Sequence, residues 1–247
     1  MKKDIVLCGV GGDGIVSVAK IISDAALNMG MNLKQSEIHG MSQRGGSVFS
    51  HLLISDDEIF ADVIPEGQAD IILSSEPMEA LRYLPWLSKE GWVITNNYPF
   101  INISKYPDME KINAELGKLE HVVSFNANEI AKQLKARSNM VLLGATVPYL
   151  GISMEKVEEA IAHIFGKKGQ EVVDLNIQAV RAGYAQATKL SVVETQCLRL
   201  QKKKNARLVL PVGHSSVMIK RFYSVLVFLF QTQNATNAIN VMAAPMP

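Results

Sequence analysis

The chain has 247 residues, of which 48% are hydrophobic and 20% are charged, and its net charge is +1. This length suffices for one or two domains, and the apolar content excludes a chain that is disordered throughout. The near-zero net charge argues against a nucleic-acid binder that relies on a basic surface.

The first forty residues predict a strand–helix–strand unit. The apolar run Ile5–Cys8 lies between a charged residue and a glycine, which predicts a buried strand. A glycine-rich turn follows, and from Ile15 the apolar residues recur with helical spacing until Gly30, a typical helix stop. Residues 32–38 predict a second strand. This order of elements is typical of the start of a parallel α/β sheet.

Strand and helix patterns alternate as far as residue 187. Short apolar runs predict further strands at residues 47–54, 69–73, 91–95 and 121–125. Helices are predicted after Pro77, at 127–134 behind an Asn126 cap, at 139–150, from Met154 to Gly166 behind a Ser153 cap, and at 174–187. The predicted fold class is therefore α/β, a Rossmann-like parallel sheet with flanking helices, in one domain of residues 1–187.

Residues 188–247 differ in composition from the rest. They hold 8 Lys and Arg against 1 Asp or Glu, a net charge of +7, whereas residues 1–187 hold 17 against 23, a net charge of −6. The tail contains a basic run, Lys202–Lys204, and a densely apolar run, Ser224–Phe230. Neither continues the predicted sheet, so we expect a basic and apolar extension unrelated to the core function.

The two cysteines, Cys8 and Cys197, are too few for an iron–sulfur cluster, which normally takes four thiolates. Cys8 lies in the first predicted strand, where a buried free thiol is expected, and this cysteine usage fits a reducing cytoplasm. No apolar window reaches the roughly 18 residues of a membrane span, and the first apolar run is too short for a signal peptide. We therefore expect a cytoplasmic protein with no transmembrane segment and no metal site.

The turn after the first strand has the form G-x-G-x-x-G, built from Gly9, Gly11 and Gly14 with Gly12 between them. Glycines let the backbone approach a phosphate, and a helix N-terminus offers free N–H groups to an anion. Glu37 follows near the distance at which an acid meets a ribose hydroxyl in dinucleotide sites. The turn is a candidate cofactor site; the alternative is a tight turn that serves packing alone.

A second glycine-rich segment, residues 36–47, follows the second predicted strand. It gathers an acid, an imidazole, an amide and a guanidinium beyond the carboxyl end of that strand, where ligands bind in open α/β sheets. Arg44 can present a guanidinium to an anion and His39 can relay a proton, so both are candidate catalytic residues. The candidate cofactor-binding residues of this segment are Glu37, Gly40, Met41, Gln43, Gly45 and Gly46. The alternative is a polar loop that only caps the sheet.

Residues 9–16 and 36–48 together resemble the gamma-type domain of the pyruvate and related 2-oxoacid:ferredoxin oxidoreductases. The form S-E-x-H-G-M-x-Q-R-G-G is most similar to the indolepyruvate type. Residues 139–145 and 176–184 agree with it, so the resemblance covers about residues 3–187. The family commonly has Gln at the position of Asp13.

The resemblance implies a small subunit that works only with a larger alpha subunit, which carries thiamine diphosphate and iron–sulfur clusters. Together they are expected to decarboxylate a 2-oxoacid, most closely indolepyruvate or another aryl pyruvate, oxidatively with coenzyme A. The products are an aryl acyl-CoA, carbon dioxide and reduced ferredoxin. Residues 40–46 are expected to face the partner's cofactor or the coenzyme A.

Two other functions stay open at this point. A stand-alone NAD(P)-dependent dehydrogenase would use Gly9, Gly11, Gly14 and Glu37, and it would retain its nicotinamide cofactor when purified alone. A non-catalytic nucleotide-binding or interaction module would use the glycine loops as architecture, and its complex would keep its activity after severe loop substitutions.

Overall fold

The computed structural model describes the backbone of residues 1–39 and 45–207 and the side chains of residues 1–38 and 45–190. The chain divides into two units, Met1–Gln196 and Cys197–Pro247, and the fold described below is that of the first unit. The elements in chain order are β1 (Lys2–Val10), α1 (Ile15–Leu27), β2 (Asn32–His39), β3 (Ser47–Ser55), β4 (Ala69–Ser74), α2 (Pro77–Arg82), η1 (Leu84–Trp86), β5 (Leu87–Asn96), α3 (Met109–Leu116), β6 (Val122–Phe125), α4 (Ala127–Leu134), α5 (Ser138–Leu150), α6 (Met154–Phe165), η2 (Gly166–Lys168) and α7 (Gln170–Arg207).

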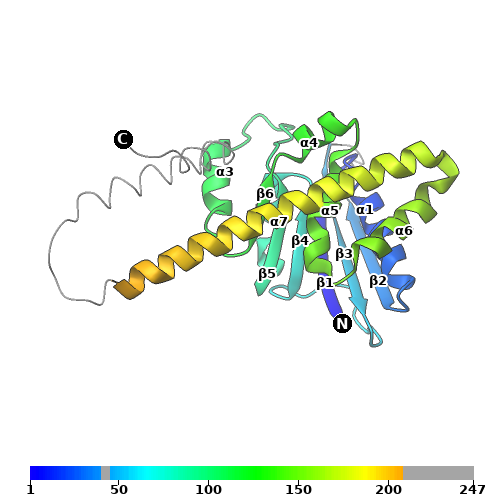
Figure 1. Cartoon of the computed structure of the whole chain (residues 1–247), viewed down its shortest axis with the longest axis horizontal. Helices are drawn as coiled ribbons and strands as arrows, with labels where there is room; N and C mark the ends of the chain where they lie inside the picture. The colour runs from blue at the N-terminus through cyan, green and yellow to red at the C-terminus, as the bar shows by residue number, and fades with distance from the viewer. Residues whose placement is uncertain (40–44, 208–247) are drawn as a thin grey trace, which may run out of the picture. The chain divides into compact units, whose positions relative to one another are not determined.

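The strands form one mixed sheet in the order β2-β3-β1-β4-β5-β6 (Figure 1). β1, β4, β5 and β6 pair in parallel, whereas β3 is antiparallel to both of its neighbours, β1 and β2. The predicted α/β class is confirmed, but the sheet is not parallel throughout. The reversal of β3 follows from its connection, because only residues 40–46 join it to β2 and a parallel crossover needs about a dozen residues or more.

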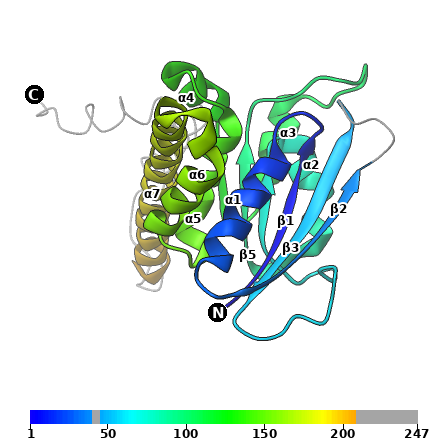
Figure 2. The ribbon, with the colours of Figure 1, turned by 90° about the vertical axis from the view of Figure 1, so that its right-hand side faces the viewer.

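Helices cover both faces of the sheet (Figure 2). One core lies between the sheet and α1, α5, α6 and α7, and the other lies between the sheet and α2 and α3. Along β1, Ile5 and Leu7 are buried in the first core, and Val6 and Cys8 are buried in the second. A strand covered on both faces has no polar side, which explains the unbroken apolar run in the sequence.

The helices α5 and α7 pack backbone against backbone at two glycines. A Cβ atom added to Gly144 would lie 1.8 Å from the carbonyl oxygen of Val180, and one added to Gly183 would lie 1.8 Å from that of Val141. No side chain fits at either point. Gly144 lies in residues 139–145 and Gly183 in residues 176–184, the two later segments that carry the family resemblance. The close contact of the helices is a structural reason for a glycine in each of these segments.

The predicted elements agree with the structure to within a few residues for most of the sheet and its helices. Asn126 and Ser153 cap α4 and α6 as predicted, each by accepting a hydrogen bond from a backbone N–H in the first turn. The helix α3 was not predicted, and the helix predicted at 174–187 is longer at both ends. The apolar run 224–230 lies outside the described residues. Within the described part of the chain, no helix has the length and hydropathy that crossing a bilayer requires.

Candidate functional site

The two glycine-rich segments meet at the carboxyl end of β1. The backbone N–H of Gly11 donates to the carbonyl of Gly46 at 2.8 Å, and the N–H of Gly45 donates to the carbonyl of Gly11 at 3.0 Å. These bonds continue the antiparallel ladder of β1 and β3 beyond its last pair, Val10 and Ser47. The fold therefore joins the two candidate motifs into one structural unit, called the paired glycine loops below and comprising residues 9–14 and 45–46.

The glycines of the first turn serve different purposes. A Cβ atom on Gly9 would lie 2.0 Å from Ser75 Oγ, and one on Gly14 would lie 2.4 Å from Asn139 Nδ2, so both permit close packing. Gly12 has a φ of 108°, and a Cβ atom there would meet nothing within 4 Å. Gly12 is thus a glycine of this turn with open space beside its backbone, where a ligand can approach.

The N-terminus of α1 has features that favour an anion and one that opposes it. Its first turn holds no acidic residue and no side chain caps it, so free N–H groups and the positive end of the helix dipole remain available. The half-buried carboxylate of Asp13 lies just before this turn and accepts a hydrogen bond from Ser75 Oγ at 2.8 Å. Burial raises the pKa of Asp13, and the bond from Ser75 acts in the opposite direction.

The remaining predicted site residues lie along β2 or outside the described residues. Glu37 is exposed and accepts a hydrogen bond from Gln35 Nε2 at 2.7 Å. Because β3 lies between β1 and β2, Glu37 is not on the strand beside the glycine turn, and this arrangement does not favour dinucleotide binding of the βαβ type. His39 ends β2 opposite Val48. The other residues of the second segment, Gly40, Met41, Gln43 and Arg44, lie outside the described residues.

A buried pair of carboxylates beside the paired glycine loops was missed by the sequence analysis. Glu76 and Glu79, at the start of α2, expose 1% and 4% of their surface. Ser47 Oγ donates to Glu79 at 2.5 Å, and Tyr106 Oη donates to Glu76. The available signal was the polar run directly after the predicted strand 69–73, at the end of the sheet where ligands bind.

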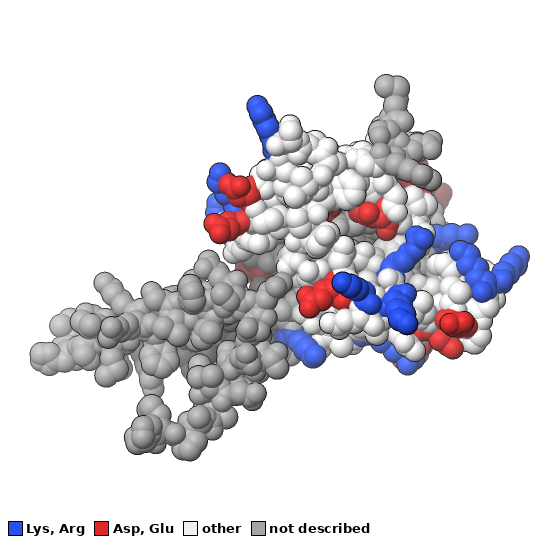
Figure 3. Space-filling model, turned by 90° about the horizontal axis from the view of Figure 1, so that it is seen from above, with Lys and Arg blue, Asp and Glu red and all other residues white. Residues whose placement is uncertain are grey.

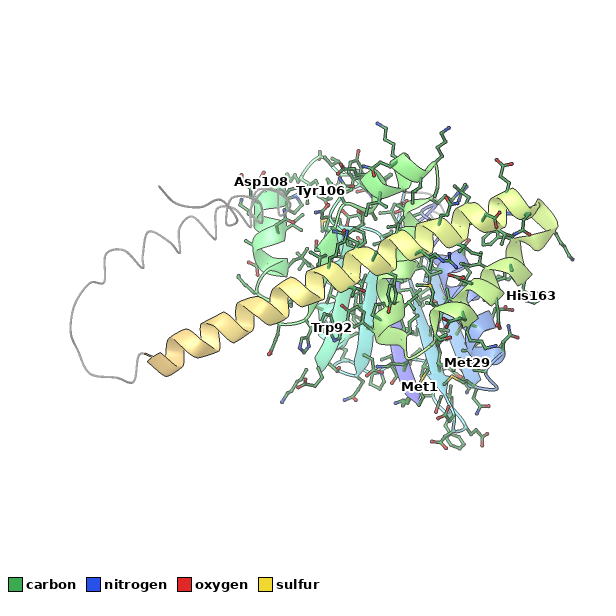
Figure 4. The ribbon with its side chains drawn as sticks, in the orientation of Figure 1. Met1, Met29, Trp92, Tyr106, Asp108 and His163 are labelled. Atoms are coloured by element: carbon green, nitrogen blue, oxygen red, sulfur yellow. The ribbon has the colours of Figure 1, made fainter. Side chains whose placement is uncertain are left out.

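The segment between β5 and α3, residues 97–108, completes this end of the sheet. Asn102 Nδ2 donates to the carbonyl of Gly45 at 2.6 Å. The segment exposes four large apolar side chains, those of Tyr98, Phe100, Ile101 and Ile103. Figure 3, which looks down on this end of the molecule, shows a broad area without charged side chains. Tyr106 lies at this end, whereas Trp92 lies toward the opposite end of the sheet (Figure 4).

The paired glycine loops lie inside a stretch that matches a known family. Residues 4–186 match the model of the pyruvate ferredoxin/flavodoxin oxidoreductase family. The chain belongs to this family. It is 40% identical over 198 residues to the indolepyruvate oxidoreductase subunit IorB of Archaeoglobus fulgidus, and the alignment covers 76% of this chain and 96% of that relative. The resemblance to the indolepyruvate type is thereby confirmed.

Two solved oxidoreductase structures share the fold. The 2-oxoglutarate:ferredoxin oxidoreductase of Magnetococcus marinus has a TM-score of 0.60 at 23% identity, over 76% of this chain and 31% of the other. The chain therefore spans about a third of that longer chain. The pyruvate oxidoreductase subunit PORC of Thermotoga maritima has a TM-score of 0.58 at 23% identity, over 74% of this chain and 96% of the other. Among the side chains that the structure describes, no group of His, Cys, Asp or Glu is arranged to hold a metal ion.

Proposed function

We propose that the chain is the small subunit of an indolepyruvate-type 2-oxoacid:ferredoxin oxidoreductase. The observation that carries the proposal is the 40% identity to an indolepyruvate oxidoreductase subunit across 96% of that relative. The complete enzyme converts an aryl pyruvate, coenzyme A and two oxidised ferredoxins into an aryl acyl-CoA, carbon dioxide, a proton and two reduced ferredoxins. Each ferredoxin takes one of the two electrons that the oxidation releases.

A larger partner subunit in the cytoplasm would hold the thiamine diphosphate and the iron–sulfur clusters. Thiamine diphosphate supplies the carbanion chemistry of decarboxylation, and the clusters carry the electrons to ferredoxin. The composition of this chain supports that division, because two cysteines are fewer than the four thiolates a cluster normally takes. This chain then contributes protein surface and not redox groups.

The paired glycine loops would face coenzyme A or the partner's cofactor. Support comes from the open backbone at Gly12 and from the uncapped N-terminus of α1, which suit a phosphate group. The Magnetococcus marinus protein, which shares this fold, has coenzyme A bound. We assign an anion contact to Arg44 and a proton relay to His39. The residues proposed to line the site are Gly9, Gly11, Gly12, Gly14, Glu37, Gly40, Met41, Gln43, Gly45 and Gly46.

Reconstitution tests this function directly. The chain should be colourless and inactive alone, and should support ferredoxin reduction only with its larger partner, indolepyruvate and coenzyme A together. Pyruvate and 2-oxoglutarate serve as comparison substrates, and lower kcat/KM values are expected for both. A flavin or cluster absorbance in the isolated chain, or retained NAD(P), would contradict the subunit assignment. A preference for pyruvate or 2-oxoglutarate would contradict the aryl substrate class.

Arg44→Ala tests the second motif in the same reconstituted pair. Loss of a charge-assisted hydrogen bond costs about 1.5–3 kcal/mol, so kcat/KM should fall roughly 10- to 100-fold. The melting temperature should stay nearly constant, because substitutions in surface loops usually change stability by about 0.5 kcal/mol or less. Lys167→Ala, in the exposed turn η2, removes one positive charge outside the two glycine-rich segments and serves as the control. Unchanged kinetics in Arg44→Ala would leave Arg44 without a role.

A further inference from the structure

The helix α2 begins with two acids that have separate tasks. Glu76 is the N-cap, and its Oε2 accepts a hydrogen bond from the backbone N–H of Glu79 at 2.9 Å. In a capping box, the acid at the position of Glu79 would reach back to the backbone N–H of the N-cap. Here that N–H donates to Ser74 Oγ at 3.3 Å instead. The carboxylate of Glu79 is therefore not used by its own N-cap and is directed to other contacts.

Glu79 binds the start of β3. Its Oε2 accepts from Ser47 Oγ at 2.5 Å, and its Oε1 accepts from Arg82 Nε at 3.2 Å. Tyr83 Oη lies 3.3 Å from the same Ser47 hydroxyl. Ser47 directly follows Gly46, whose carbonyl accepts the hydrogen bond from Gly11. Glu79 thus fixes the residue at which the second glycine segment enters the sheet.

Glu76 binds the segment 97–108 with its other oxygen. Oε1 accepts hydrogen bonds from Tyr106 Oη and, at 3.4 Å, from the backbone N–H of Phe100. Burial raises the pKa of Tyr106, and the bond to Glu76 raises it further, so the phenol remains a neutral donor. Between these two anchors lies Asn102, which donates to the carbonyl of Gly45 at 2.6 Å. These hydrogen bonds link α2 to residues 97–108, residues 97–108 to the second glycine segment, and that segment back to α2.

Two buried carboxylates are a costly means of holding a fold together. Carboxylates lose hydration when they are buried, and apolar residues of similar volume often stabilise a protein equally well or better. A fully hydrogen-bonded buried network, in contrast, specifies one geometry. Each oxygen of Glu76 and Glu79 accepts at least one hydrogen bond, as such a network requires.

We infer that Glu76 and Glu79 are positioning residues that hold the paired glycine loops and residues 97–108 in one arrangement. The pair acts through Ser47, Tyr106 and Asn102 and does not itself touch a ligand. The inference rests on the proposed function for its catalytic consequence, but the coupling between the two segments is a property of this chain alone.

Amide hydrogen exchange of the full-length chain tests the coupling without any activity. Tyr106→Phe removes one donor to Glu76, and Ser47→Ala removes one donor to Glu79. Each should speed exchange at the N–H groups of both Phe100 and Gly45 roughly 2- to 10-fold, the effect of one lost hydrogen bond on local opening. Ser47→Thr retains a hydroxyl and should restore slow exchange. If each substitution affects only the segment that carries it, the segments are not coupled and the inference is overturned.

The reconstituted pair tests the catalytic consequence. Ser47→Ala should raise KM for coenzyme A roughly 5-fold while kcat changes little, and Ser47→Thr should restore the lower KM. Ser153→Ala is the matched control for stability, because it removes the cap of α6 at a cost of about 0.5–2 kcal/mol and should leave KM unchanged. If Ser47→Ala leaves the KM for coenzyme A unchanged, the carboxylate pair has no positioning role in catalysis, even if the two segments are coupled. A wild-type pair without coenzyme A-dependent activity would refute the proposed function and leave the exchange result standing.

Discussion

Cys8 is fully buried in β1, and its Sγ lies 3.7 Å from the carbonyl oxygen of Glu79, to which it donates. Burial raises the pKa of this thiol from 9.0 to about 12, and a hydrogen bond with Ser74 acts against the shift. Between these two values the unfolded chain releases the thiol proton while the folded chain keeps it. The protonated Cys8 thiol therefore contributes its full stabilisation of the fold below about pH 9. Above that pH this contribution to the free energy of unfolding falls by up to about 1.4 kcal/mol per pH unit.

Urea unfolding from pH 8 to pH 11 measures this loss, with Cys8→Ala as the comparison. The variant is less stable at pH 8 because a small cavity replaces the thiol. The difference in free energy of unfolding should narrow as pH rises, since the variant has no thiol to ionise in its unfolded state. Other titrating groups act equally in both proteins and cancel. Parallel curves would mean that the thiol does not keep its proton in the folded state.

Single residues of the site were predictable from sequence only where local geometry decides them. The glycine turn was found because a strand, a tight turn and a helix follow one another directly. The packing role of Gly9 and Gly14 was not predictable from the sequence. Each packs against a side chain that is distant in sequence, Ser75 for Gly9 and Asn139 for Gly14. Glu76 was overlooked for the same cause, since its burial depends on Tyr106 from another segment.

Helix packing carries a second prediction, because α5 and α7 touch through glycine. Gly183→Ala should destabilise the fold by about 1–3 kcal/mol, since a Cβ atom 1.8 Å from the carbonyl oxygen of Val141 forces the helices apart. Helix propensity alone would favour alanine by about 1 kcal/mol. A lower free energy of unfolding in Gly183→Ala would therefore show that the steric clash outweighs helix propensity. Gly166→Ala is the control, because a Cβ atom there meets nothing and the φ of −52° suits alanine. Thermal and urea unfolding of both variants decide between steric clash and helix propensity. A Gly183→Ala variant as stable as the wild type, or more so, would contradict the close contact of the helices.

Most elements were predictable from the sequence, but their arrangement was only partly so. Apolar runs and caps place strands and helices because these signals are local. The position of β3 between β1 and β2 depends on long-range pairing, although the short connection 40–46 was a usable sign of its direction. The helix α3 gave a weak signal, because within it only Ile112 and Leu116 are buried.

For the whole molecule, the end of the family match and the end of α7 fall at different residues. The family match stops at residue 186, and the indolepyruvate relative is covered over 96% of its length by the aligned part of this chain. The boundary at residue 187 stays a prediction, and the division of the chain into compact units falls later, between Gln196 and Cys197. The helix α7 nevertheless continues to Arg207, and Leu190 still packs against the core. The boundary of function and the end of α7 therefore need not coincide.

Two truncated chains, ending at Ala187 and at Gln196, separate these boundaries. We predict that both assemble with the larger subunit and support full turnover, because every motif with chemical content precedes residue 187. The shorter chain should be less stable, by an amount on the order of 1 kcal/mol, because it lacks the partly buried Leu190. Copurification with the partner, turnover of the pair and the melting temperature measure the three effects. If the chain ending at Gln196 folds but no longer binds the partner, residues 197–247 belong to the functional unit, and the boundary at 187 is wrong.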